Sequence, residues 1–182
     1  MGIEIEKKYR LSPELRERLS LRLREVRAER EGLEFEENTI YTGGNLVPGR
    51  SILRVRRVEG RAILTYKERY PSSSSIKRQR EEETGVDNPE ALAAILDAMG
   101  LSPELVYEKR RETWHLAGAI IVMDELPFGL FAEIEGEEKA IEEAEKLLEL
   151  EQAEDEPATY PQLTLRHGER NGTAIEARFK KP

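Results

Sequence analysis

Apolar and polar residues alternate along several short segments, and this period of two predicts β-strands. The first segment, residues 2–10, alternates isoleucine with charged residues (Ile3 and Ile5 against Glu4, Glu6 and Lys8). Further strands are predicted over residues 34–41, 51–58, 61–69, 76–86, 105–116, 119–125 and 130–136. Because short turns join successive strands, we expect antiparallel pairing.

Helices are predicted where apolar residues recur at the helical period. In the first, Ser12 serves as N-cap and Pro13 as the first helical residue, before a stripe of Leu15, Leu19, Leu23 and Val26. The second lies between Asn88 and Gly100, with Leu92, Ile95, Leu96 and Met99 expected to point inward. A third, acidic helix is predicted over residues 137–156, with Ile141, Ala144 and Leu148 inward. These amphipathic helices are expected to pack on the sheet.

The charged residues of each strand fall at alternate positions, so they share one face of that strand. The residues expected on this face are Glu4, Glu6, Lys8, Arg54, Arg56, Thr65, Lys67, Arg80, Glu82, Lys109, Arg111, Asp124, Glu133 and Glu135. The opposite faces carry Ile3, Ile5, Leu53, Val55, Leu64, Tyr66, Ile121, Met123, Leu130, Ala132 and Ile134. In the segment 78–83 nearly every residue is charged, so Glu82 is chosen while Glu81 and Glu83 stay open.

Two folds can accommodate this pattern. A sheet with one apolar face on the core and one charged face in water is the ordinary arrangement for a single strand. Such solvated faces usually mix threonine, serine, lysine and glutamate, whereas these positions are nearly all long charged residues, with acids clustered on the first and last strands and bases between. We therefore predict an α+β, mainly antiparallel protein in which a closed β-barrel encloses the charges and amphipathic helices flank it.

Composition narrows the function classes. The net charge of −8 comes from residues 137–156, where ten acids face two lysines, so the rest of the chain is neutral and duplex nucleic acid is not an expected partner. The chain has no cysteine, which suits a reducing compartment and makes the cytoplasm the expected location. The sequence contains no stretch of about 18 apolar residues, so no membrane-spanning helix is predicted. The 182 residues suit one domain, taken as residues 1–182.

The charges inside such a barrel are of both signs, so its ligand must suit basic and acidic side chains at the same time. Arginine and lysine side chains suit phosphate oxygens, with arginine able to make paired contacts. The acids would repel a phosphate chain unless a cation lay between, and carboxylates without histidine or cysteine favour Mg²⁺ or Mn²⁺. A polyphosphate bound with a divalent metal suits both the basic residues and the acidic residues.

Four short motifs, in order along the chain, carry a family resemblance. Glu4-Ile5-Glu6-Lys7-Lys8 resembles an ExExK signature, Leu53-Arg54-Val55-Arg56 an LRxR strand, Leu64-Thr65-Tyr66-Lys67 an LTxK strand, and Phe131-Ala132-Glu133-Ile134-Glu135 an FxEIE strand. Asp124 stands at the spacing of a metal-site aspartate, and Thr159-Tyr160 resembles a Ser-Tyr pair. Over about residues 2–163 the chain thus resembles the CYTH, or triphosphate tunnel metalloenzyme, superfamily.

The resemblance implies an eight-stranded antiparallel tunnel with a small-molecule triphosphate inside. The expected metal ligands are Glu4, Glu6, Glu82, Asp124, Glu133 and Glu135. The expected triphosphate-binding residues are Lys8, Arg54, Arg56, Lys67, Arg80, Lys109 and Arg111. Of these, Lys8 and Lys67 are expected to be catalytic. Lys180 and Lys181 have no assigned role.

Three functions follow from that resemblance. The leading hypothesis is metal-dependent hydrolysis of an inorganic or organic triphosphate, such as tripolyphosphate or thiamine triphosphate. Alternatives are a class IV adenylyl cyclase, which converts ATP to cyclic AMP and pyrophosphate, and a non-catalytic module that binds polyphosphate or nucleotide. A homodimer is a further expectation, because two-fold dimers are the commonest oligomers.

Overall fold

The computed structural model describes residues 2–70 and 77–180, apart from the side chains of residues 2–4, 77 and 78. The strands in this part of the chain are β1 (Gly2–Leu11), β2 (Glu29–Gly43), β3 (Ser51–Val58), β4 (Arg61–Arg69), β5 (Lys77–Val86), β6 (Leu101–Leu116), β7 (Ala119–Leu126), β8 (Gly129–Glu135), β9 (Glu169–Asn171) and β10 (Ala174–Ala177). The helices are α1 (Pro13–Glu25), α2 (Pro89–Ala98), α3 (Glu138–Leu147) and α4 (Tyr160–His167).

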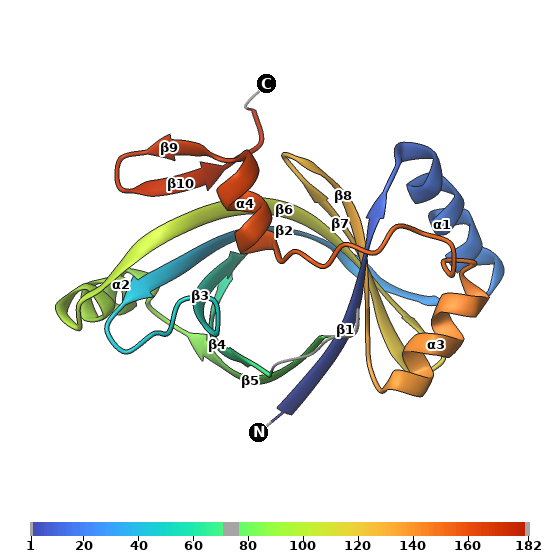
Figure 1. Cartoon of the computed structure of the whole chain (residues 1–182), viewed down its shortest axis with the longest axis horizontal. Helices are drawn as coiled ribbons and strands as arrows, with labels where there is room; N and C mark the ends of the chain where they lie inside the picture. Colours follow the sequence, from blue (N-terminus) through green and yellow to red (C-terminus); the bar gives the residue numbers. More distant parts are fainter. Residues whose placement is uncertain (1, 71–76, 181–182) are drawn as a thin grey trace.

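The first and last of eight successively paired strands also pair with each other. The order is β2-β3-β4-β5-β1-β8-β7-β6, and β6 pairs again with β2. Figure 1 shows the resulting sheet curled into a half-barrel, with α1 and α3 together on one side and α2 on the other. The predicted α+β class with antiparallel strands and flanking helices is therefore confirmed.

Closure of the barrel is less complete than predicted. The described ladder between β1 and β5 covers Gly2–Glu6, whereas the ladder between β1 and β8 covers Glu6–Leu11. The two ladders therefore share one residue of β1, and the neighbouring strands separate on either side of it. The fully closed barrel was a wrong prediction, because alternation along single strands carries no information about where their ladders end.

The apolar outer face of the sheet packs against the helices. Four of its predicted residues are buried in one cluster: Ile121, Met123, Ala132 and Ile134. The helix residues in the same cluster are Leu19 and Leu23 of α1 with Ile141 and Ala144 of α3. None of the described helices has the length and apolar character needed to cross a membrane.

Helix α2 covers another part of the outer face but differs from its prediction. Leu96 is buried beside Val55 and Leu101, and Leu92 packs against this cluster. Ile95 and Met99, predicted to point inward, are instead 55% and 65% exposed. The contact therefore uses a narrower stripe of the helix than its apolar composition suggested.

Several boundaries and elements also differ from the sequence prediction. The strands β2 and β6 are longer than predicted and pair along almost their whole length, from Glu29 opposite His115 to Gly43 opposite Leu101. Helix α3 ends at Leu147 rather than continuing to residue 156. Helix α4 and the strands β9 and β10 were not predicted, and β10 adds to β6 in parallel. These additions lie beside the end of the barrel that begins β6 (Figure 1).

Candidate functional site

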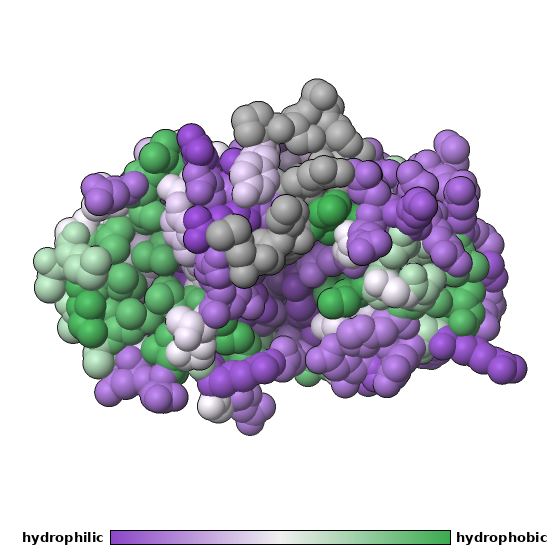
Figure 2. All heavy atoms as spheres, turned by 90° about the horizontal axis from the view of Figure 1, so that it is seen from below, coloured by the Kyte–Doolittle hydropathy of each residue, from purple (hydrophilic) through white to green (hydrophobic). Residues whose placement is uncertain are grey.

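The inner face of the curled sheet encloses a cavity of about 340 Å³, here called the charged cavity. The predicted site residues that line it are Glu6, Lys8, Arg54, Arg56, Lys67, Lys109, Arg111, Glu133 and Glu135. Figure 2 shows hydrophilic side chains gathered in a hollow near the middle of the face it displays. The alternation rule thus placed most of the predicted residues on one enclosed surface.

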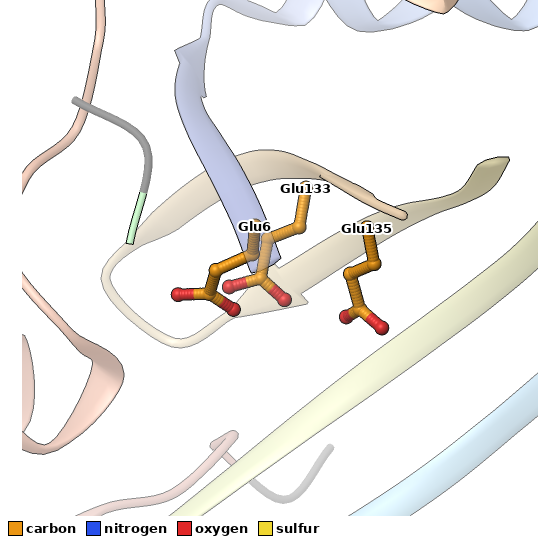
Figure 3. A group of neighbouring side chains, drawn as sticks. All are labelled: Glu6, Glu133 and Glu135. Atoms are coloured by element: carbon orange, nitrogen blue, oxygen red, sulfur yellow. The ribbon is translucent and has the colours of Figure 1, made fainter. Parts of the chain in front are cut away.

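Three carboxylates converge on one wall of the charged cavity. Glu6 of β1 lies opposite Glu135 in the β1–β8 ladder, and Glu133 is two residues from Glu135 on the same face. One carboxylate oxygen of each residue lies within 4.8 Å of one from each of the other two (Figure 3). Glu6 and Glu133 are buried and Glu135 is half-buried. We call this group the acidic triad.

The acidic triad has the chemistry of a divalent cation site. Three carboxylates this close repel one another when ionised, and burial strengthens that repulsion. A hard divalent cation among their oxygens would offset it, and Mg²⁺ and Mn²⁺ both prefer oxygen ligands. The residues present therefore fit such an ion.

Glu4 and Asp124, also predicted as metal ligands, differ from the acidic triad. The side chain of Glu4 lies outside the described residues, although its backbone belongs to β1. Asp124 is fully buried beneath the cations instead of joining the acidic triad. Its carboxylate accepts hydrogen bonds from Arg111 Nε at 2.8 Å, Arg111 Nη2 at 2.6 Å and the Tyr160 hydroxyl at 2.8 Å. In this arrangement Asp124 orients cationic side chains.

The inward face of β5 was predicted wrongly. Arg80 and Glu82 lie on the outer face, where Arg80 Nη2 and Glu82 Oε1 are 3.2 Å apart and both side chains are about 40% exposed. The residues of β5 that line the charged cavity are Gln79, Glu81 and Glu83. Register with β4 sets this face, because Glu81 pairs with Lys67 and shares its side of the sheet.

Two arginines of β3 supply donors on the wall of the cavity. The Nε atoms of Arg54 and Arg56 are buried and have no hydrogen-bond partner among the described residues. Their guanidinium groups reach Glu83 Oε1 at 3.4 and 3.3 Å. Burial, and then the neighbouring Arg54, lower the pKa of Arg56. Unpartnered buried donors of this kind are costly, and an anionic ligand would satisfy them.

Lys8 is held between an acid and an aromatic ring. Its Nζ lies 3.1 Å from Glu133 Oε1 and 3.8 Å from the centre of the Tyr160 ring. Burial opposes its charge, but Glu133 and Glu6 outweigh burial and raise the pKa of Lys8. The ammonium therefore keeps its proton at neutral pH and remains a donor and a positive charge inside the cavity.

Helix α4 fixes the position of Tyr160. Thr159 caps the helix, its hydroxyl accepting from Gln162 N while the Gln162 side chain accepts from Thr159 N, and a proline follows in the first turn. This capping box is a local signal for a helix start, although the helix was not among the predicted elements. It brings the ring of Tyr160 over Lys8 and its hydroxyl to Asp124.

Sequence reasoning missed Glu36, an acid of the site that is as completely buried as Asp124. Its carboxylate is fully buried and lies 3.4 Å from Lys109 Nζ, 3.7 Å from Arg56 Nη1 and 3.9 Å from Arg111 Nε. Burial opposes ionisation, but Lys109, Arg111 and Arg56 outweigh it and lower the pKa of Glu36 to about 2. Burial and the adjacent Arg111 lower the pKa of Lys109.

Two further cavity residues could have been found by the same alternation rule. Arg69 shares the face of Lys67 on β4, and Tyr107 shares the face of Lys109 on β6, and both line the charged cavity. Glu36 offered a weaker signal, because acids occur at residues 34, 36 and 37 and therefore on both faces of the strand. The alternation does not show which of these faces points inward.

Comparisons with known proteins agree with this geometry. A family model described as CYTH domain matches residues 2–163. No curated protein sequence is similar enough to match. Solved structures match over most of the chain. A protein from Pyrococcus horikoshii OT3 is 25% identical with a TM-score of 0.76, covering 86% of this chain and 96% of that one.

Two other solved structures carry descriptions of activity. A proposed adenylyl cyclase from Hippeastrum, described as having a dominant triphosphatase activity, is 22% identical with a TM-score of 0.70, covering 95% of this chain and 99% of that one. A proposed adenylate cyclase from Vibrio parahaemolyticus is 21% identical with a TM-score of 0.70, covering 89% and 97%. At these identities the likeness shows the fold.

Proposed function

This chain belongs to the CYTH domain family, and from that premise we propose that it hydrolyses triphosphates with the aid of a divalent cation. One observation carries the proposal. The acidic triad and a set of buried or half-buried cations face the same cavity of about 340 Å³. A triphosphate with its cation neutralises both groups at once, which neither a metal alone nor a phosphate alone would do.

The acidic triad would hold the cation, which when bound polarises phosphoryl oxygens and offsets their negative charge. Arg54 and Arg56 would bind non-bridging phosphate oxygens through their unpartnered Nε groups. Lys67, whose Nζ lies 2.8 Å from Glu81 Oε2, would contact the same chain from β4. These contacts fix the phosphate chain along the cavity.

Hydrolysis forms a bond between a water oxygen and the terminal phosphorus while the bridging P–O bond breaks and the attacking water gives up one proton to solvent. Negative charge then builds on the bridging oxygen as it leaves with the bonding electrons. Lys8 stays protonated and so can donate a hydrogen bond to that oxygen, which lowers the barrier by stabilising the developing charge. Lys8 and Lys67 are therefore the proposed catalytic residues.

The test is a product assay with tripolyphosphate, thiamine triphosphate and ATP in the presence of Mg²⁺ or Mn²⁺. We expect metal-dependent phosphate release, reduced about 100-fold or more in Glu6→Gln. Glu17→Gln serves as control, because Glu17 is exposed on α1 and lies outside the charged cavity. Its phosphate release should equal that of the unaltered protein.

The other two functions give different products in the same assay. Cyclic AMP and pyrophosphate as the main products from ATP would replace the proposal with a cyclase. Tight triphosphate binding without any product would replace it with a binding module. The activity described for the Hippeastrum protein is of the proposed kind, although its 22% identity carries only the fold.

A further inference from the structure

A second cavity, of about 310 Å³, adjoins the charged cavity, and we call it the apolar groove. Its apolar lining includes Ile40, Leu46, Ile52, Leu105, Pro161 and Leu165. The two cavities share wall residues Ile40, Ile52, Arg69, Thr159 and Pro161, so they lie next to each other. One side of the groove is formed by α4, which packs on β6 at this end of the barrel (Figure 1).

The change from charged to apolar lining occurs within neighbouring strands. On β3 the inward position changes from Arg54 to Ile52, two residues or about 7 Å along the strand. On β6 the inward positions change from Lys109 to Leu105 over four residues. Ile40 of β2 pairs with Leu105 and continues the apolar floor. The groove floor thus begins about 7 Å along β3 from the nearest arginine of that strand.

Arg69 stands at the boundary between the two cavities. It lines both of them, and its Nε is buried with no hydrogen-bond partner in the described part of the chain. A guanidinium at this point suits the phosphate that joins a phosphate chain to an organic group. Polar atoms of Thr42, Glu104 and Gln162 at the groove's edge add groups that can orient such a ligand.

We propose that the apolar groove binds the planar heterocyclic group of an organic triphosphate, so that the substrate is an organic triphosphate and not free tripolyphosphate. This inference rests on the proposed function, because the phosphate chain would occupy the charged cavity. Tripolyphosphate would leave the partly exposed groove side chains Leu46, Ile52 and Leu165 facing water. A heterocyclic ring would cover them and gain the free energy of burying apolar surface.

The proposal is tested by comparing organic with inorganic triphosphates in one variant. Leu165 lies on α4, is 50% exposed and lines the groove, so Leu165→Glu places a charge there with little cost to folding. The control is Leu21→Glu, because Leu21 is 52% exposed on α1, far from the groove. The substrates are ATP, GTP, CTP, thiamine triphosphate and tripolyphosphate, and kcat/KM is measured for each.

In the unaltered protein we expect at least one organic triphosphate to exceed tripolyphosphate in kcat/KM by about tenfold or more. Leu165→Glu should lower that ratio about tenfold, whereas Leu21→Glu should leave it unchanged. Any long-range repulsion by the added carboxylate acts on both substrate classes, so the ratio isolates the groove. Equal or better use of tripolyphosphate, or an unchanged ratio in Leu165→Glu, would overturn the inference.

Binding measurements separate this inference from the proposed function. Calorimetry with Mg²⁺ uses diimidotriphosphate and the β,γ-imido analogues of ATP, GTP and CTP, in which the bridges to the terminal phosphates are not hydrolysed. Tighter binding of an imido nucleotide than of diimidotriphosphate, lost in Leu165→Glu, supports the groove even if no substrate is hydrolysed. Tripolyphosphate hydrolysis with no such preference supports the proposed function and contradicts the groove.

Discussion

Glu36→Gln tests whether the buried cations depend on the acid that lies among them. The substitution keeps the size of the side chain and removes its charge. The ordinary pKa of 4.5 falls to about 2 because Lys109, Arg111 and Arg56 together outweigh burial. At about 1.36 kcal/mol for each pKa unit, the difference corresponds to about 3 kcal/mol of stability at neutral pH.

The pH dependence gives this prediction its sign. Because the folded pKa lies below the unfolded pKa, the stabilisation is complete above about pH 4.5 and is lost as the pH falls through about 2. We therefore expect Glu36→Gln to lower the free energy of unfolding by about 3 kcal/mol at about pH 7. The difference from the unaltered protein should shrink as the pH approaches 3.

Urea denaturation at several pH values measures both quantities. Glu37→Gln is the matched control, because Glu37 is the next residue of β2 and pairs with Arg178 at the partly exposed surface. An exposed ion pair of this kind contributes only about 0 to 1 kcal/mol. The role assigned to Glu36 would be refuted if Glu36→Gln cost no more than Glu37→Gln, or if its cost were the same at about pH 7 and about pH 3.

Two further predictions concern β5 and the end of β2. Glu81→Gln should lower triphosphate turnover about tenfold or more, because Glu81 Oε2 lies 2.8 Å from Lys67 Nζ in the charged cavity. Glu82→Gln, on the outer face, should leave turnover unchanged. Equal effects of the two substitutions in a phosphate-release assay would contradict the face assigned to β5. Gly43→Ala should cost about 2 to 4 kcal/mol, since Gly43 has φ +104° and its Cβ would meet Gly100 O at 2.3 Å. Thermal unfolding checks this against Gly49→Ala, which has φ +78° and open space around it and should cost about 1 kcal/mol.

The sequence predicted most of the barrel because its strands are marked on both faces. On β8 the apolar residues Ala132 and Ile134 alternate with Glu133 and Glu135, so this strand can be placed in only one register without exposing its core face. The same contrast placed Glu133 and Glu135 of the acidic triad on the inner face, where both line the charged cavity. Helix stripes with a clear cap, such as the one beginning at Ser12, were equally informative.

The errors arise where that contrast is absent. Residues 78–83 are polar on both faces, so alternation cannot choose between Glu81 and Glu82, and pairing with β4 decides. The face of Glu36 was hidden for the same reason, since acids occur at both parities of its segment. Its function depends on three cations from β3 and β6, which is long-range information that no local pattern contains.

The missed elements at the end of the chain had local signals of their own. Thr159 and Gln162 form a capping box around Pro161, which marks the start of α4. Gly172 and Thr173 form the two-residue turn that joins β9 to β10, and Gly172 supplies the positive φ (+61°) that such turns favour. The parallel pairing of β10 with β6 could not be read from these signals, because it depends on how the finished barrel presents its edge.

The proposed function requires the acidic triad to hold a divalent cation, and Mn²⁺ binding followed by electron paramagnetic resonance tests this most directly. The compared variants are Glu135→Gln and the control Glu137→Gln, whose glutamate is exposed at the start of α3. We predict that Glu135→Gln weakens Mn²⁺ binding about tenfold or more, while Glu137→Gln binds as the unaltered protein does. Equal Mn²⁺ affinity in all three proteins would contradict a cation site at the acidic triad.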